Sequence, residues 1–237
     1  MDGLISIAGV IAILWALSGS IALVGRGGVS LRWLLAATAV VILNDALLTN
    51  GYGQLPDLIG GDWNWQGKLL ATAATLAVAA LPALGWRASG LTLSQATNSV
   101  GPALLVSLLY IGFFAGLALA FPNDQPSSET IAFQMTMPGL EEEIFYRGVL
   151  LLILAQAFTG RLTVLGVDWH WGAILSSVLF GLVHAFGYSE GAFSFDIVTM
   201  ALTSVPSLIG VWLVLRTRSV LFPAVLHNFG NTITAVV

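Results

Sequence analysis

The chain has 237 residues, of which 57% are hydrophobic and 8% charged, and its formal net charge is −4. Soluble domains carry roughly 25% charged residues, so a chain with a mean hydropathy of +0.91 is expected to fold in lipid, as a single membrane domain over residues 1–237. The negative charge argues against a nucleic-acid partner, which requires clustered Lys and Arg. The absence of cysteine excludes disulfides, a cysteine nucleophile and cysteine-ligated zinc.

Eight segments are apolar enough to cross a bilayer, which takes about 20 mostly apolar residues in a helix. They lie near residues 4–25, 33–50, 68–86, 102–121, 139–159, 171–186, 195–215 and 219–237. We therefore predict an all-α fold, a polytopic bundle of about eight transmembrane helices. Pro82, Pro206 and Pro223 are expected inside spans, where neighbouring helices satisfy the freed backbone groups. The connections at 49–67 and 122–138 have room for short helices but not for a second core.

The short connections predict the orientation of the bundle. With eight spans, alternate connections lie on the same side of the membrane. The arginines outside the spans all fall on one side: Arg26, Arg32, Arg87, Arg161, Arg216 and Arg218. Lys68, at the edge of a span, is the single cation on the other side. Because basic connections stay in the cytoplasm, we expect both termini to lie outside.

The fifth predicted span carries charges, which cost roughly 2.5–3.5 kcal/mol each at the centre of a membrane helix. It opens with Glu141-Glu142-Glu143-Ile-Phe-Tyr-Arg147. On a helix, Glu143 and Arg147 are one turn apart in the order that favours an ion pair. Glu142 points roughly 100° away from Glu143 and meets a different neighbour. Glu141 is expected at the membrane interface, as an acidic helix start that the helix dipole favours.

Two later spans carry further polar groups. Phe180-Gly-Leu-Val-His184 ends the sixth span, where a histidine on its own is more often a packed or interfacial residue. His227-Asn-Phe-Gly-Asn231 in the last span puts His227 and Asn231 on one helical face. That face suits either donors for a developing oxyanion or hydrogen bonds between helices. In the predicted orientation all three clusters converge in the outer half of the bilayer, which favours a functional site.

In order and spacing, these clusters resemble the EExxxR, FxxxH and HxxxN motifs of the CAAX protease and bacteriocin-processing family, which includes the type II CAAX prenyl endopeptidase. The motif-bearing part covers about residues 100–237. The resemblance implies a conical helical bundle with a cavity open to lipid and water. It also implies an intramembrane endopeptidase that hydrolyses a peptide bond with an activated water.

The resemblance assigns a catalytic role to four residues. Glu142 is implied to be the general base that activates water, and His184 to hold that water with it. His227 and Asn231 are implied to form the oxyanion hole.

The same resemblance implies that Glu143 and Arg147 form a structural pair that orients Glu142. We expect no required cofactor. The alternative is a zinc ion bound by the glutamate and the two histidines, although the chain contains no HExxH motif.

The predicted orientation ranks the candidate substrates. A site in the extracytoplasmic half suits a membrane-anchored protein or peptide exported with its anchor attached, and we expect the chain to process one in a bacterial or archaeal cell membrane. Cleavage of prenylated CAAX proteins, which are processed in the cytosol, ranks lower. A non-catalytic membrane scaffold or immunity protein is an alternative of another class. A transporter would use Asn44-Asp45 as its ion site, but no pair of interrupted, symmetry-related spans supports one.

Overall fold

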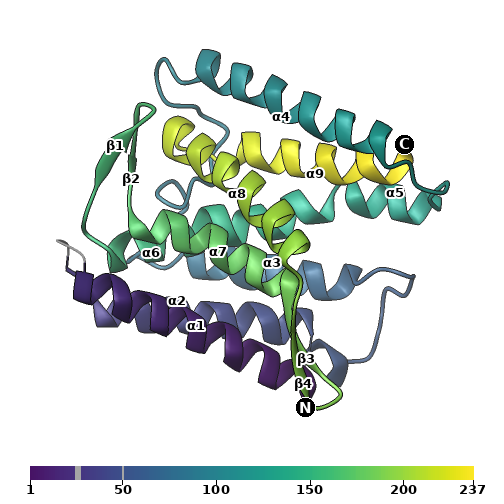
Figure 1. Ribbon diagram of the computed structural model, residues 1–237, viewed down its shortest axis with the longest axis horizontal. Helices are drawn as coiled ribbons and strands as arrows, with labels where there is room; N and C mark the ends of the chain where they lie inside the picture. Colours follow the sequence, from purple (N-terminus) through teal and green to yellow (C-terminus); the bar gives the residue numbers. More distant parts are fainter. Residues whose placement is uncertain (25–27, 50) are drawn as a thin grey trace.

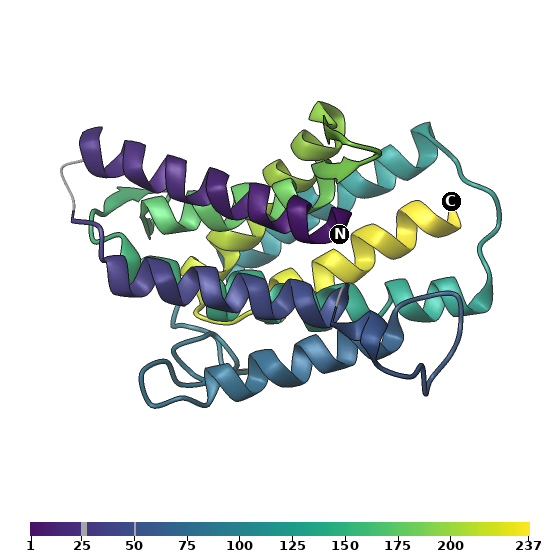
Figure 2. The ribbon, with the colours of Figure 1, turned by 90° about the horizontal axis from the view of Figure 1, so that it is seen from below.

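The computed structural model describes residues 1–24, 28–49 and 51–237, and Figures 1 and 2 show it from two sides. The helices are α1 (Asp2–Val24), α2 (Leu31–Leu48), η1 (Tyr52–Gln54), α3 (Trp65–Ala79), α4 (Val100–Ala120), α5 (Ser128–Gln134), η2 (Pro138–Leu150), α6 (Leu151–Ala157), α7 (Trp171–Ala185), α8 (Ile197–Thr217) and α9 (Leu221–Val236). The strands are β1 (Leu162–Val164), β2 (Val167–Trp169), β3 (Phe186–Ser189) and β4 (Ala192–Phe195). The chain is therefore mostly helical, as its composition predicts.

Each predicted span coincides with a helix, and the fifth coincides with η2 and α6, which follow one another without a break. Over the described ranges, four helices are long and apolar enough to cross a membrane by themselves, namely α1, α2, α4 and α8; α7 is a shorter apolar helix. These helices support an integral membrane bundle, while the count of eight spans stays a prediction. Gly25, Arg26 and Asn50, on which parts of the span and orientation predictions fall, lie outside the described residues.

The third helix is shorter than predicted. α3 ends at Ala79, and residues 80–99 form turns that lead to α4. Pro82 has no N–H to donate and disfavours helical backbone at the residue before it, so the prediction that Pro82 lies inside a span is wrong. Pro206 does lie inside α8, and Pro223 lies in the first turn of α9.

The η2–α6 segment forms the centre of the bundle. It packs against α2, α3, α7 and α9. Its charged residues explain this position, because Glu141, Glu143 and Arg147 are only 0%, 2% and 3% exposed and lipid would not solvate them. The peripheral helix α4 instead exposes leucines such as Leu104 and Leu105, which lipid tails can cover.

Two short hairpins interrupt the helical fold, so the prediction of an all-α chain is incomplete. β1 pairs antiparallel with β2, and β3 with β4. Each turn holds two residues with positive φ, Leu165 and Gly166 at 51° and 73°, and Glu190 and Gly191 at 53° and 83°. That backbone geometry closes a two-residue hairpin whose twist matches its strands.

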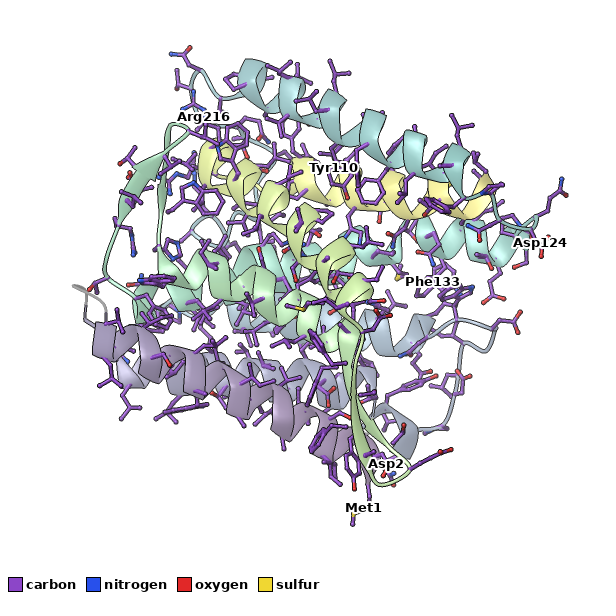
Figure 3. All side chains as sticks on the ribbon, in the orientation of Figure 1. Met1, Asp2, Tyr110, Asp124, Phe133 and Arg216 are labelled. Atoms are coloured by element: carbon purple, nitrogen blue, oxygen red, sulfur yellow. The ribbon has the colours of Figure 1, made fainter. Side chains whose placement is uncertain are left out.

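The basic and acidic connections lie at opposite ends of the molecule. Figure 3 labels Arg216 at one end and Asp124 at the other. Arg87, Arg161 and Arg218 line a single cavity, so these arginines gather at one end. Both chain termini lie away from the β1–β2 hairpin at that end (Figure 1). The fold therefore separates the charges along the direction of its helices.

Candidate active site

The three consecutive glutamates lie on η2 and contact three different sets of neighbours. η2 is a π-helix, whose backbone hydrogen bonds span five residues instead of four and which is frequent at functional sites. Glu141 contacts α2 and α3, Glu142 contacts α3, α7 and α9, and Glu143 contacts its own helix and α9. The run of glutamates thus connects the centre of the bundle to four surrounding helices.

Glu143 lies between an arginine and a histidine. Its Oε1 is 3.0 Å from Arg147 Nη1, in an ion pair whose side chains are 2% and 4% exposed. The same oxygen is 2.7 Å from His227 Nδ1. Because an ionised carboxylate only accepts, the Nδ1–H of His227 donates to Glu143. This contact fixes the imidazole and turns its Nε2 toward Glu142, from which it lies 3.7 Å away.

Glu142 faces two imidazoles across a short gap. Its Oε2 lies 3.7 Å from His227 Nε2 and 4.0 Å from His184 Nε2. His184 Nδ1 lies 2.7 Å from the carbonyl oxygen of Phe180, and since a carbonyl only accepts, this nitrogen carries the proton. In its neutral form, His184 therefore presents the lone pair of Nε2 to Glu142. The separations are too long for direct hydrogen bonds and suit a bridging water.

Phe180 packs against the charged and imidazole groups of the site. Its ring lies 4.1 Å beneath the guanidinium carbon of Arg147, a cation–π distance. Its centroid is 4.6 Å from the ring of His184 and 5.8 Å from that of His227. The aromatic residue of the second motif therefore packs against residues of all three motifs.

All six residues singled out from the sequence line one cavity of about 190 Å³: Glu142, Glu143, Arg147, His184, His227 and Asn231. Aromatic side chains of α4 and polar or small residues of α8 complete it, including Tyr110, Phe114, Thr203, Ser207 and Gly210. The sequence offered no motif for these lining residues. Polar and charged side chains from three motifs and apolar side chains from α4 therefore line the same cavity.

Asn231 reaches this cavity from α9 and is held by α5. Its Nδ2 donates to Gln134 Oε1 over 3.1 Å. α5 in turn is tied to the 49–67 connection, because Glu129 Oε1 accepts from the backbone N–H of Asp62 at 2.9 Å and from Trp65 Nε1 at 3.0 Å. The hydrogen bond from Asp62, followed by that from Trp65, lowers the pKa of the Glu129 carboxyl below its ordinary value.

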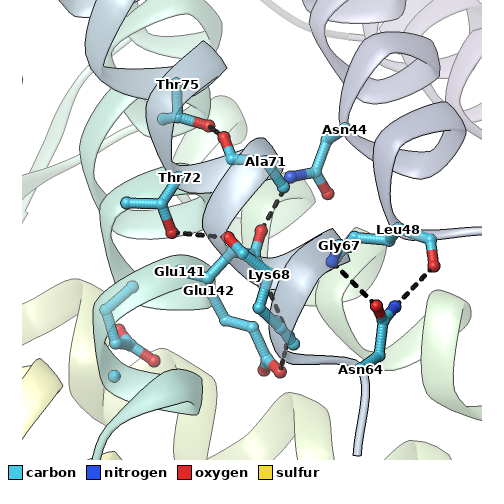
Figure 4. Close-up of polar contacts among 12 residues, drawn as sticks. Asn44, Leu48, Asn64, Gly67, Lys68, Ala71, Thr72, Thr75, Glu141 and Glu142 are labelled. Atoms are coloured by element: carbon cyan, nitrogen blue, oxygen red, sulfur yellow. Dashed lines mark hydrogen bonds and ion pairs between the residues drawn. The ribbon is translucent and has the colours of Figure 1, made fainter. Parts of the chain in front are cut away.

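Lys68 is the site residue that sequence reasoning missed. Its Nζ lies 2.6 Å from Glu141 Oε2 and 2.6 Å from Glu142 Oε1 (Figure 4). Asn44 Nδ2 donates to the other Glu141 oxygen over 2.7 Å. These two donors from α2 and α3 satisfy the Glu141 carboxylate where it is completely buried, so its partners are protein groups and not the membrane interface.

The contacts add Lys68 to the groups that can orient Glu142. The sequence interpretation gave this role to Glu143 and Arg147, but Glu143 contacts His227 and it is Lys68 that contacts Glu142. A cation at hydrogen-bonding distance stabilises the ionised carboxylate. The only visible signal in the sequence was that Lys68 stood alone on the predicted outer side.

The same geometry bears on metal ligation. Over residues 1–24, 28–49 and 51–237, no three His, Cys, Asp or Glu side chains are arranged to hold a metal ion. Asp45 belongs to the pair that a transporter would use as its ion site. It accepts a hydrogen bond from Thr49 and is not among the residues that line the cavity.

Comparison with known proteins agrees with the motifs. Residues 125–233, slightly under half of the chain, match the family model described as Rce1-like, type II CAAX prenyl endopeptidase Rce1-like. No curated protein and no solved structure matches the chain. The resemblance to the CAAX protease family is therefore confirmed over residues 125–233, the part of this membrane protein that carries all six residues singled out from its sequence.

Proposed function

We propose that the chain is a glutamate-dependent intramembrane endopeptidase. The family match supports CAAX-type peptide hydrolysis as the reaction class. The observation that carries the glutamate mechanism is the approach of Glu142 Oε2 to the Nε2 atoms of His227 and His184, at 3.7 and 4.0 Å, on one cavity. A water molecule held among these three atoms can donate one proton to Glu142 and the other to the Nε2 lone pair of His184.

In the proposed reaction, Glu142 takes a proton from this water while the water oxygen attacks the carbonyl carbon of the scissile peptide. His184, with its Nε2 lone pair toward the cavity, holds the water in line. The new carbon–oxygen bond gives a tetrahedral oxyanion. When the carbon–nitrogen bond breaks, Glu142 returns the proton to the leaving amine. A positioned general base of this kind contributes about 10²–10⁴ in rate.

His227 and Asn231 are proposed to stabilise the oxyanion. Because the Nδ1–H of His227 already donates to Glu143, donation to an oxyanion requires a second proton, on Nε2. In that form the ring lies between Glu143 on one side and Glu142 on the other. Asn231 has a second N–H beyond the one that Gln134 engages.

The substrate is proposed to be a membrane-anchored protein or peptide. An apolar groove of about 490 Å³ between α4 and α8 is lined by residues such as Val106, Phe113 and Val205, and it shares Tyr110 and Phe114 with the catalytic cavity. An apolar anchor in this groove would put the adjoining peptide bond beside Glu142. The loop charges support an extracytoplasmic site and hence an exported, C-terminally anchored substrate.

A prenylated CAAX protein is the second candidate substrate, and the family match is the observation that favours it. A prenyl chain is as apolar as a membrane anchor, so the groove between α4 and α8 suits both. The two candidates differ in the side of the membrane from which the substrate arrives.

The test is cleavage by purified protein in detergent. Tagged anchored export substrates and a farnesylated CAAX peptide are incubated with the parent, Glu142→Gln and His184→Ala, each with and without a chelator. Glu190→Gln, in the exposed β3–β4 turn, is the matched control. We expect both site variants to lose at least about 10²-fold in rate, and the control and the chelated parent to remain active.

Other outcomes would change the assignment. Loss on chelation with rescue by zinc would replace water activation by metal ligation through Glu142 and the two histidines. Cleavage that Glu142→Gln leaves intact would refute the glutamate mechanism. A folded parent that cleaves no substrate in the panel would favour a non-catalytic scaffold or immunity protein.

A further inference from the structure

A second cavity lies at the arginine-rich end, and residues of η2 and α6 such as Gly148 and Leu151 line it. It has a volume of about 690 Å³, and Arg87, Arg161 and Arg218 line it from three separate connections. We call it the arginine cavity. None of these residues takes part in the proposed peptide hydrolysis, so the catalytic mechanism does not account for their convergence.

The arginine cavity carries uncompensated positive charge. Within the described ranges, none of its three connection arginines is within ion-pairing distance of a carboxylate. Arg161 is held in place by backbone carbonyls, including that of Ala155 at 2.7 Å. The cavity has one acidic lining residue, Asp168, which accepts a hydrogen bond from Thr163. Three guanidinium groups against one carboxylate favour an anionic ligand.

The buried hydroxyl of Ser89 also favours a ligand in the arginine cavity. Ser89 lines the arginine cavity, is 1% exposed, and its Oγ has no hydrogen-bond partner among the described residues. An unpaired buried hydroxyl is unfavourable, and a ligand oxygen would satisfy it. His170 also lines the cavity, and its Nδ1 accepts from the N–H of Ala173. Burial lowers the pKa of His170 to about 4, so neutral His170 has its N–H on Nε2, as a further donor.

An apolar groove adjoins the arginine cavity. Its volume is about 670 Å³, and Arg161 and His170 line both spaces. The rest of the groove is mainly apolar, with Leu162, Trp169 and Trp171 among its lining residues. A basic, donor-rich space that continues into an apolar one matches an amphiphile with an anionic head and a hydrocarbon chain.

We propose that the arginine cavity binds the phosphate of an anionic phospholipid, with one acyl chain of the same lipid in the adjoining groove. Guanidinium groups bind phosphate oxygens with charge-assisted, bidentate hydrogen bonds, and basic pockets between membrane helices on the cytoplasmic side bind anionic lipid head groups. Arg147 lines both this cavity and the catalytic one, so a bound lipid lies one residue away from the active site.

Native mass spectrometry of the detergent-purified protein tests the proposal by counting bound lipids. Phosphatidylglycerol, phosphatidylcholine and inorganic phosphate are titrated separately into the parent, Ser89→Ala and the double variant Arg87→Gln/Arg218→Gln. The control is Arg32→Gln, an exposed arginine that is not among the residues lining the cavity. This readout does not depend on proteolysis, so the lipid site can be refuted without refuting the proposed function, and the reverse also holds.

We expect the parent and Arg32→Gln to retain one phosphatidylglycerol with the same affinity. The double variant should bind it at least about tenfold more weakly, the loss expected for a charge-assisted hydrogen bond. Ser89→Ala removes one donor without removing charge and should weaken binding by less. Equal binding by the parent and the double variant would refute the site. Equal retention of phosphatidylcholine would refute selection by charge, and displacement of the lipid by inorganic phosphate would refute a lipid ligand in favour of a soluble phosphate.

Discussion

Replacing Lys68 by methionine removes the cation that bridges two glutamates while keeping an apolar stem of similar length. The Lys68 ammonium lies 2.6 Å from Glu141 and 2.6 Å from Glu142, and the three side chains are 14%, 0% and 14% exposed. Opposite charges 4 Å apart attract by about 4 kcal/mol at an effective dielectric constant of about 20. Removing one partner of a buried ion pair costs about 3–5 kcal/mol. We expect Lys68→Met to lower the free energy of unfolding by that amount.

A second substitution separates the charge from the shape. In Lys68→Met, Glu141 keeps only the hydrogen bond from Asn44, at 2.7 Å, and faces Glu142 without the cation between them. Glu141→Gln keeps an oxygen for Asn44 but removes the buried charge. The double variant Lys68→Met/Glu141→Gln should therefore recover part of the lost stability, with a coupling energy of about 1–3 kcal/mol between the two positions.

Reversible unfolding by sodium dodecyl sulfate in mixed micelles measures both quantities. Arg32→Met, which removes an exposed cation, is the control and should change the unfolding free energy by no more than about 0.5 kcal/mol. A loss below about 1 kcal/mol for Lys68→Met, or strictly additive effects of the two substitutions, would refute the reasoning. Lys68 would then be a lysine at the membrane surface and not part of the buried site.

Three further results are expected. Because the chain has no cysteine, Asp124→Cys should react with a membrane-impermeant maleimide in intact cells and Ser94→Cys only after permeabilisation; the reverse pattern would put the site on the cytoplasmic side. The lowered pKa of Glu129 means that its ionised form stabilises the docked 49–67 connection above the ordinary carboxyl pKa and that this stabilisation is lost as the pH falls through the lowered value. The protection of that connection from hydrogen exchange, taken relative to the intrinsic exchange rate at each pH, should therefore fall between about pH 6 and about pH 3, and Glu129→Gln should remove the difference. Gly139→Ala should lower stability by about 1–3 kcal/mol and abolish cleavage, because its Cβ would collide with the backbone of α9; Gly116→Ala, with nothing within 4 Å, is the neutral control.

The helices were predictable because membrane helices are specified by long apolar runs, which a sequence displays directly. The errors have equally physical causes. The end of α3 was placed too late because the apolar run continues through Leu81-Pro82-Ala83-Leu84, although the proline ends the hydrogen-bonded helix at Ala79. The hairpins were missed because their turns, Leu165-Gly166 and Glu190-Gly191, lack the Asn-Gly or Asp-Gly pair that signals a two-residue turn most strongly.

The candidate site was predictable only where its residues recur at helical spacing. The three motifs fix seven residues, Phe180 included, and all seven line one cavity. Gln134, which binds Asn231, and Asn44, which binds Glu141, stand at sequence separations that no local pattern connects. Their partners are fixed by the packing of α5 against α9 and of α2 against η2. Such contacts depend on tertiary structure, and a single sequence does not encode them in any periodic form.

Lys68 is an intermediate case, since the sequence displayed it as an exception. The arginines of the connections lie on one predicted side, and Lys68, the only lysine, lies on the other. Glu141 and Glu142 are exceptions of the opposite kind, as carboxylates inside an apolar span. Lipid solvates neither an isolated ammonium nor an isolated carboxylate. A lysine on the side without arginines and glutamates inside an apolar span are therefore both stabilised if they pair with each other. Lys68 makes such pairs, because it lies 2.6 Å from both glutamates. In a membrane chain, an unexpected cation and unexpected carboxylates on the same predicted side are therefore a reason to infer that they are in contact.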